Sequence, residues 1–408
     1  MNTGIDEPAT VNGDVKVAIV ATSFGSSGGV ATVASFLYHR LSASERYLPE
    51  LISVPMPAGT EVNVRMSHPD SWFSGVQVKK KRDGIPYREI GAFLAEFEFQ
   101  RYRPRPALTK ELEKYDLVQV VAGAPNWAYL TKNISAPVAL QVATLIETER
   151  EGRYQEEVFP LRLWRHGMTK IAAWMERQVP SMVDAIFVEN QWMYEHYRQN
   201  HPDANVHFAP PGVDTSTYHP AEETNDDAYI LSVGRFSDPR KNVELLFEAY
   251  HRLRQRRPDA PRLVLAGLAG PRESAWATAK SLGIADHIDV NVEVPEEKLV
   301  RLYRNASLFV LSSKEEGLGL AIAEAMASGI PVVSTDCGGP STLIKEGKTG
   351  YLTPVGDPDA LADRMQTILE NPDHARGLGE RGRKRIEEHF SEEAAGEKFL
   401  EVYDQLLG

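Results

Sequence analysis

The sequence predicts an α/β protein with two doubly wound parallel sheets. Short, continuously apolar runs alternate with segments of helical periodicity, and this alternation occurs twice, on either side of a break rich in proline and polar residues. The length of 408 residues agrees, because a single hydrophobic core seldom serves so long a chain. Such sheets bind ligands beyond the carboxyl ends of their strands, so we expect a small-molecule site in a cleft between two domains.

The first series opens with a strand at residues 15–21, a Gly/Ser loop at 22–29 and a helix at 30–41. This order is typical of the first unit of a doubly wound sheet. Asp83-Gly84 stands between two runs of alternating polarity and predicts a β-hairpin. Further strands are expected at 117–121, 138–142 and 185–188, with a helix that is apolar on one side at 161–179.

The break covers residues 205–220 and continues into an acidic stretch at 221–227, where we expect a linker. The second series has strands at 229–233, 262–266, 288–292, 308–311 and 331–334, and helices at 243–256, 274–282, 296–305, 318–328 and from 360 onward. We therefore predict a polar tail at 1–14, an N-terminal domain at 15–216, a C-terminal domain at 217–390 and a terminal segment at 391–408.

Charge and composition argue against several classes of function. The net charge of −12 disfavours nucleic acid as the main partner, because phosphate backbones need a basic surface. No apolar run is long enough for a transmembrane helix, and the first residues lack the pattern of a signal peptide. The single cysteine, Cys337, allows no intrachain disulfide, which fits a cytoplasmic protein. The basic run at 79–82 is a solvated hairpin tip or a contact to an anionic acceptor or membrane surface, so peripheral membrane contact stays open.

Two glycines precede the first helix. Gly28 and Gly29 let the backbone approach a ligand closely at a helix N-terminus, which favours anions. Their loop matches neither the dinucleotide-binding nor the P-loop glycine pattern. A tight strand-to-helix turn is an equally good interpretation.

Three cations follow the first strand of the second series. Arg235 comes directly after Gly234, and Arg240 and Lys241 precede the next helix. Cations at the carboxyl end of a strand are costly unless they meet an anion, and an arginine fork with a compact lysine charge suits a diphosphate. The alternative is a solvated loop, which leaves Lys241 near a helix start, where the helix dipole disfavours a cation.

Two glutamates, Glu316 and Glu324, bracket the start of the helix at 318–328. A carboxylate accepts hydrogen bonds from vicinal hydroxyls, as sugars and ribose present them. The backbone N–H groups between the two glutamates lie at a helix N-terminus, where an anion is favoured. This set is what a nucleoside diphosphate sugar needs. The alternative is that both residues are ordinary helical acids.

The segment that carries this pair, EEGLGLAIAEAMASGIPVV, resembles the E-x7-E signature of family 4 retaining glycosyltransferases with the GT-B fold. PPGVD at 210–214, VGRFSDPRKN at 233–242, the glycine loop within 336–358 and SSGGV near the N-terminus agree in order and spacing. The resemblance is strong over residues 229–369, whereas 54–112 match nothing. It implies two Rossmann-like domains facing across a cleft, with a last helix at 392–407 that crosses back to the N-terminal domain.

The resemblance implies a role for each matching residue. Arg235 and Lys241 would hold the donor diphosphate and stabilise its charge as it leaves, and Glu316 would bind hydroxyls of the transferred sugar. Glu324 would bind the ribose. Further donor contacts are implied for Gly28, Gly29, Gly234, Val294, Gly317, Leu318, Gly319 and Leu320.

The implied reaction moves a hexose from a nucleotide diphosphate sugar, with UDP or GDP as the nucleotide, to a hydroxyl acceptor with retention. The departing diphosphate oxygen takes the proton of the acceptor, so catalysis is mainly positioning and stabilisation of the leaving group. We expect no metal site and no cofactor besides the co-substrate, because the sequence has neither an Asp-x-Asp motif nor a His cluster.

Ala143 departs from the family pattern. Many relatives carry a histidine at the end of the strand that corresponds to residues 137–143, and alanine stands there in this chain. A catalytically inactive relative that binds nucleotide sugars is therefore an alternative. An NAD-dependent oxidoreductase is another, which the missing G-x-G-x-x-G pattern disfavours.

The acceptor is expected on the N-terminal domain. Trp127 would stack on a sugar, and Arg101 and Arg103 would pair with phosphates. Core packing of Trp127 and a solvated face for the arginines explain the same residues equally well. The sequence does not identify the acceptor.

Overall fold

The computed structural model describes residues 15–24, 28–56, 61–74, 76–83, 85–150, 159–221 and 228–408. Several segments named above lie outside these residues: the tail at 1–14, residues 25–27 of the Gly/Ser loop, Gly84 of the hairpin and most of the acidic stretch at 221–227. Within the described residues, no helix is long and apolar enough to cross a membrane.

Eight strands form the first sheet, in the order β3-β4-β2-β1-β5-β6-β7-β8. Their bounds are β1 Val15–Ala21, β2 Tyr47–Ser53, β3 Val78–Asp83, β4 Ile85–Ile90, β5 Leu117–Ala122, β6 Val138–Val142, β7 Ala185–Val188 and β8 Val206–Phe208. β1 pairs in parallel with β2 and β5, whereas β3 and β4 are antiparallel with Asp83 opposite Ile85. The central strands β1, β5 and β6 are buried, as their continuous apolar runs predict.

The helical segments that accompany these strands are mostly short. They are α1 Gly29–Ser42, α2 Asp70–Ser74, α3 Glu98–Tyr102, α4 Pro106–Leu112, η1 Pro125–Thr131, α5 Ile146–Arg150, α6 Phe159–Glu176, η2 Val179–Ser181 and α7 Gln191–Asn200. The first helix buries Ala31, Val33, Phe36 and Leu37 at helical spacing. It begins at Gly29, so the two glycines named above are its cap and its first residue.

Six parallel strands form the second sheet, in the order β11-β10-β9-β12-β13-β14. Their bounds are β9 Tyr229–Arg235, β10 Arg262–Ala269, β11 Ile288–Val292, β12 Leu308–Leu311, β13 Val332–Thr335 and β14 Tyr351–Thr353. The chain order reverses between β9 and β12, which are neighbours although two strands separate them in sequence. Such a reversal point is where open α/β sheets bind ligands.

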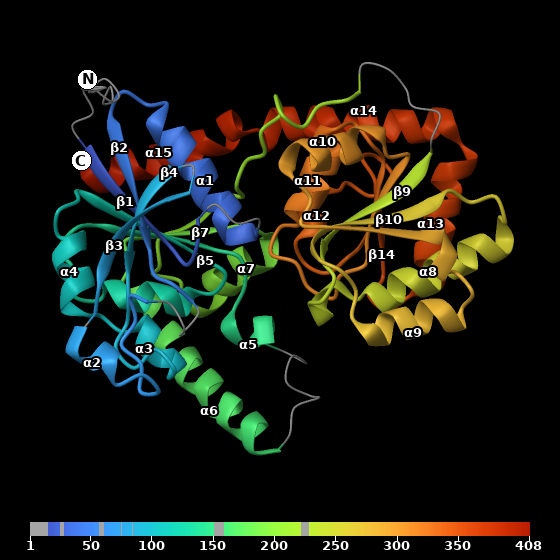
Figure 1. Cartoon of the computed structure of the whole chain (residues 1–408). Coiled ribbons are helices and arrows are strands. Elements are labelled where there is room, and N and C mark those ends of the chain that lie inside the picture. Colours follow the sequence, from blue (N-terminus) through green and yellow to red (C-terminus); the bar gives the residue numbers. More distant parts are fainter. Residues whose placement is uncertain are drawn as a thin grey trace, which may run out of the picture. The chain divides into compact units, whose positions relative to one another are not determined.

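Helices cover both faces of the second sheet, and Figure 1 shows α8 and α11 on opposite sides of β9. One core joins α8 Val243–Arg256, α9 Glu273–Ser281 and α13 Pro358–Glu370 to the sheet. The other joins α10 Glu296–Asn305, α11 Leu320–Ala327 and α12 Pro340–Leu343. The remaining helical segments are η3 Pro239–Lys241, η4 Ala285–His287, α14 Pro372–His389 and α15 Glu392–Leu407. Two sheets, one parallel and one parallel except for the β3–β4 pair, with helices between most strands, confirm the predicted α/β class.

The chain forms two compact units. Unit 1 comprises the described residues of Met1–Gln141, Trp174–Ala185 and Leu400–Gly408, and unit 2 those of Val142–Ala173 and Ile186–Phe399. The last residues of α15 therefore belong with β5 in unit 1, where the hydroxyl of Tyr403 donates to Oε1 of Gln119 at 2.6 Å. Tyr47 of β2 also donates a hydrogen bond to Asp404.

Three local predictions need correction or extension. The predicted linker at 205–220 begins with a strand, since residues 206–208 form β8. β2 was not expected, because Pro49 and Glu50 interrupt its apolar pattern. The helix predicted from 318 starts at Leu320, since Gly319 adopts the left-handed conformation at φ 88° and ψ 57°. The predicted hairpin is confirmed by the pairing of β3 with β4.

Candidate functional site

The candidate site lies within unit 2, at the carboxyl edge of the six-stranded sheet. β9 pairs with β12, with Ile230 opposite Leu308, and β12 pairs with β13. The loops that follow these strands therefore come together, although they are far apart in sequence. Arg235 is the last residue of β9, and the segments that follow the three strands hold Lys241, Glu316 and Gly338.

Arg240 links two of these loops. Its guanidinium donates to Oδ2 of Asp238 at 2.9 Å and to Oε2 of Glu315 at 2.8 Å. Burial opposes ionisation of Asp238, but its hydrogen bonds with Arg240 prevail and lower its pKa to about 2. Burial likewise opposes the charge of Arg240, and the two carboxylates more than offset it, raising the pKa. Arg240 is therefore neutralised by the protein and fixes the loop between β9 and α8.

Lys241 meets Glu316 at the same edge. Its Nζ lies 2.6 Å from Oε1 of Glu316, and the two side chains are only 20% and 13% exposed. The hydroxyl of Ser313 donates to the same carboxylate oxygen at 2.5 Å. The predicted diphosphate cation and the predicted sugar carboxylate are thus brought into direct contact.

The loop from Glu316 to Gly319 rests on the glycine loop after β13. Glu316 and Gly338 form an isolated β-bridge, and the N–H of Gly339 donates to the carbonyl of Glu316 at 3.1 Å. A Cβ at Gly339 would lie 2.5 Å from the carbonyl oxygen of Gly317, so only glycine allows this approach. The glycine loop after β13 therefore supports the loop that carries Glu316.

Asn190 holds Ala143 and Gly317 together, and it was not among the predicted site residues. Its Nδ2 donates to the carbonyl of Ala143 at 2.9 Å and to that of Gly317 at 2.7 Å, while its Oδ1 caps α7 by accepting from the N–H of Met193. A Cβ at Gly317 would lie 2.6 Å from Cβ of Ala143 and 3.0 Å from Oε2 of the buried Glu189. The only signal was an asparagine directly between a strand and a helix, which is typical of an N-cap.

Glu324 lies one turn inside α11 and contacts a buried tyrosine. The hydroxyl of Tyr303 donates to its Oε2 at 2.6 Å. Burial raises the pKa of the Glu324 carboxyl to about 7; Glu296 adds to this rise and the hydrogen bond from Tyr303 opposes it. Burial therefore favours the protonated form of Glu324, which is not an exposed helical acid.

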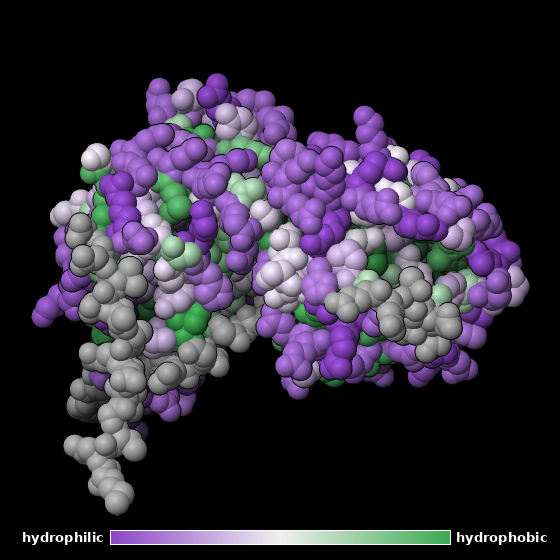
Figure 2. All heavy atoms as spheres, turned by 90° about the horizontal axis from the view of Figure 1, so that it is seen from above, coloured by the Kyte–Doolittle hydropathy of each residue, from purple (hydrophilic) through white to green (hydrophobic). Residues whose placement is uncertain are grey.

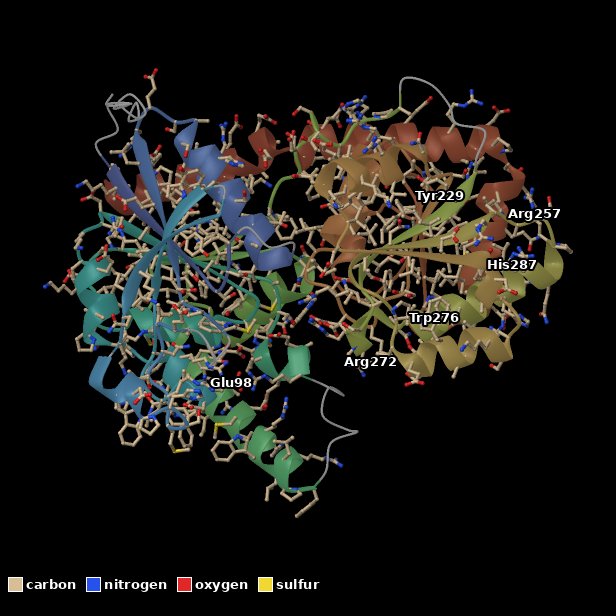
Figure 3. All side chains as sticks on the ribbon, viewed as in Figure 1. Glu98, Tyr229, Arg257, Arg272, Trp276 and His287 are labelled. Atoms are coloured by element: carbon tan, nitrogen blue, oxygen red, sulfur yellow. The ribbon has the colours of Figure 1, made fainter. Side chains whose placement is uncertain are left out.

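Arg235 is the cation with the weakest protein partner of the three. Its side chain is 53% exposed, and its guanidinium lies 3.8 Å from Oδ2 of Asp238. Gly234 packs against the Lys241 side chain, and a Cβ at Gly267 would lie 2.2 Å from the Gly234 carbonyl oxygen. Arg272, labelled in Figure 3, donates to the carbonyl of Ser237 at 2.7 Å and fixes the same loop; it was not predicted.

The remaining predicted donor contact in unit 2 is Val294. It is partly buried and packs against the core that contains α10 and α11. The residue before it, Glu293, has a positive φ of 51°, and its N–H donates to the carbonyl of Gly267 at 2.8 Å. Val292 is 53% exposed, so this segment offers an apolar surface beside a fixed backbone.

The other predicted residues lie in unit 1. Gly28 and Gly29 have open space where a Cβ would stand, so neither is required by packing. Trp127 is 8% exposed and packs edge-on against Tyr102 at 4.7 Å between ring centroids, as its core-packing interpretation expects. Arg101 is partly exposed and donates through Nε to the carbonyl of Ala95, whereas Arg103 is exposed.

A separate pocket of about 580 Å³ lies in unit 2. Its lining includes Asn305, Ser307, Gly329 and Ile330, which precede β12 and β13. It is therefore at the amino edge of the sheet, whereas the charged cluster is at the carboxyl edge. Because α/β sheets bind ligands at the carboxyl edge, we take the cluster as the candidate site.

Comparison with known proteins relates this chain to glycosyl transferases. Residues 214–385, less than half of the chain, match the family model "Glycosyl transferases group 1". Alpha-maltose-1-phosphate synthase of Mycolicibacterium smegmatis is 28% identical over 60% of this chain and 70% of its own length. A GDP-mannose-dependent mannosyltransferase of the same organism, acting on phosphatidylinositol monomannoside, is 29% identical over 49% of this chain and 56% of its own length.

The solved structure of sucrose-phosphate synthase from Thermosynechococcus elongatus superposes on 96% of this chain with a TM-score of 0.72, at 21% identity. The fold is GT-B. The GT-B fold expected from the sequence is therefore confirmed, and the family match and the named relatives support glycosyl transfer as the chemistry.

Proposed function

We propose that this chain is a retaining glycosyltransferase that moves a hexose from a nucleotide diphosphate sugar to a hydroxyl acceptor. The observation that carries the proposal is the contact between Lys241 and Glu316 beside the N-terminus of α11. It puts a cation suited to a diphosphate next to a carboxylate suited to sugar hydroxyls. The match of residues 214–385 to group 1 glycosyl transferases supports the same chemistry.

In this proposal donor binding breaks the ion pair between Lys241 and Glu316, and each of the two side chains then binds the donor. Arg235, exposed and only loosely paired, and Lys241 bind the diphosphate, together with backbone N–H groups at the start of α11. As Lys241 turns to the phosphate, Glu316 accepts hydrogen bonds from hydroxyls of the sugar while Ser313 keeps its carboxylate in place. Glu324 binds the ribose hydroxyls from inside the same helix.

The chemical step is a front-face displacement. The bond between the anomeric carbon and the diphosphate oxygen breaks, the acceptor oxygen forms a bond to that carbon on the same face, and the departing oxygen takes the acceptor proton. Arg235 and Lys241 stabilise the negative charge that develops on the leaving diphosphate. With these two cations the step needs neither a protein nucleophile nor an obligatory metal ion, and this part of the proposal is open to direct test.

The experiment is incubation with UDP-, GDP- and ADP-sugars, with and without a chelator, followed by NMR. We expect one nucleotide series to release nucleoside diphosphate, with the sugar first appearing in the anomeric configuration of the donor, at a rate that the chelator does not change. An inverted anomer would contradict retention. A rate that falls with chelator and returns with a divalent cation would contradict metal independence.

Ala143 supports a second candidate, an inactive nucleotide-sugar-binding protein. Its methyl group abuts Gly317, so position 143 offers the candidate site no hydrogen-bonding side chain. Binding of a nucleotide sugar without release of nucleoside diphosphate, onto water or any acceptor tested, would favour this candidate.

A further inference from the structure

The α6 helix presents its large apolar side chains to solvent. Phe159 is 78% exposed, Leu163 62% and Trp174 56%, and Trp164 is 47% exposed. Positions 159, 163 and 174 fall within about 60° of one another on a helical wheel, so they form one stripe along the helix.

The buried residues of the same helix lie in its second half and include three small side chains and Met175, which is 2% exposed. Ala172 is 0% exposed, Ala173 2% and Thr169 9%. The hydroxyl of Thr169 accepts a hydrogen bond from Arg150 of α5 at 3.1 Å, and Lys170 pairs with Glu147 at 2.7 Å. Met175 is thus buried, whereas Phe159, Leu163 and Trp174 are left exposed, which is unusual for large apolar side chains of one helix.

The charges on α6 indicate what covers this face. The helix carries Arg162, Arg165 and Lys170, and its one acidic residue is the last, Glu176, within a chain whose net charge is −12. Arg162 and His166 are exposed near Leu163 in the sequence. The surface in Figure 2, by contrast, is mostly hydrophilic, with hydrophobic residues in small groups.

We propose that α6 binds the surface of an anionic membrane, lying in the lipid interface with Phe159, Leu163 and Trp174 inserted. A helix with an apolar face, basic residues and tryptophan has the composition of interfacial helices, and its basic side chains are attracted by anionic headgroups. A two-fold symmetric pairing of two copies through this face would set one basic helix against another, so for that arrangement charge complementarity favours the membrane. This inference does not depend on the proposed transfer reaction.

The test is co-sedimentation of the full chain with vesicles. We expect binding to phosphatidylglycerol–phosphatidylcholine vesicles that weakens with added salt, and little binding to phosphatidylcholine alone. Leu163→Glu should lower the partition coefficient at least about tenfold, and Arg162→Gln about fivefold. Val355→Glu, at a residue that is 44% exposed in the turn between β14 and α13, is the matched control and should bind like the wild type.

Three outcomes would overturn the proposal. The wild type would remain in the supernatant with anionic vesicles, or Leu163→Glu would bind as well as Val355→Glu. Alternatively, the wild type would form a dimer that Leu163→Glu dissolves while neither protein binds vesicles, which would assign the face to a second copy. Circular dichroism of both variants shows that a loss of binding is not a loss of folding.

Discussion

The ammonium group of Lys241 lies 2.6 Å from a carboxylate oxygen of Glu316, 75 residues further along the chain. The contact exists because β9 and β12 are neighbours in the sheet, which brings the loops after both strands to one edge. In the proposed function this ion pair holds the ligand-free site in order, and the donor diphosphate replaces Glu316 as the partner of Lys241.

Loss of this lysine should weaken nucleotide binding. We expect Lys241→Ala to reduce the affinity for the nucleoside diphosphate by about 1.5–3 kcal/mol, the contribution of a hydrogen bond to a charged group. Calorimetric titration measures it. The exposed neighbour Lys314→Ala is the control and should bind normally. Equal affinities for both variants would remove Lys241 from the phosphate site.

Replacement of the carboxylate should separate turnover from nucleotide affinity. Glu316→Gln should lower kcat by about tenfold or more without weakening the binding of the free nucleoside diphosphate, because Glu316 contacts the sugar of the bound donor and its loss leaves Lys241 free for the phosphate. Glu315→Gln is the matched control, since Glu315 pairs with Arg240 instead. A similar loss of turnover in both variants would indicate a general disturbance of the loop and contradict the assigned role.

Nucleotide binding should release a proton from Glu324. Burial raises its pKa to about 7, and ribose hydroxyls that donate to the carboxylate favour its charged form, so the ligand lowers this pKa. At neutral pH we expect the release of up to about half a proton per bound nucleotide. Calorimetry in two buffers of different ionisation enthalpy measures it. No release by the wild type, or the same release by Glu324→Gln, would contradict a ribose contact.

The same group makes folding stability depend on pH. Between the ordinary value of 4.5 and about 7 the folded protein holds a proton that the unfolded chain has lost, so this group lowers stability as the pH rises through that window. Glu324→Gln removes this effect. Its free energy of unfolding should therefore rise relative to that of the wild type by up to about 3 kcal/mol between about pH 5 and pH 8. Urea unfolding of both proteins at the two pH values measures this change. The same difference in the free energy of unfolding at both pH values would show that the pKa of Glu324 is not raised.

Asn190 should matter for both folding and the site. Asn190→Ala removes the cap of α7 and the hydrogen bonds to the carbonyls of Ala143 and Gly317, so we expect a loss of about 2 kcal/mol in the free energy of unfolding. It should also raise the KM for the donor. Asn200→Ala, which loses one exposed hydrogen bond at the end of the same helix, is the control. Equal free energies of unfolding and equal KM values for the two variants would show that the contacts of Asn190 stabilise neither the fold nor the site.

The sequence predicted elements and site residues to different degrees. Buried parallel strands such as β1 and β5 are readable because both faces are covered, so their runs are continuously apolar. The contact of Lys241 with Glu316 was not readable, because it depends on the strand order of the sheet. Nor was the neutralisation of Arg240, which sequence alone shows as one more cation beside Lys241.

Burial was the hardest property to predict. Trp127 was a candidate to stack on a sugar and is packed against Tyr102, whereas the apolar stripe of α6 was predicted on a helix without a sign that it faces solvent. Periodicity shows that a helix has an apolar face, but the direction of that face depends on tertiary contacts. Asn190 was missed for a similar reason, since its two carbonyl partners come from separate segments.

The measurement that decides whether this cluster binds a donor is a thermal-shift panel of UDP-, GDP- and ADP-sugars on the wild type and Lys241→Ala. A ligand at about 100 times its Kd stabilises a protein by about 2.7 kcal/mol, which is a readable shift. We predict that one nucleotide series shifts the Tm of the wild type and that Lys241→Ala loses most of that shift. A shift of equal size in the variant, or none in the wild type with any series, would contradict the placement of the donor diphosphate at Lys241.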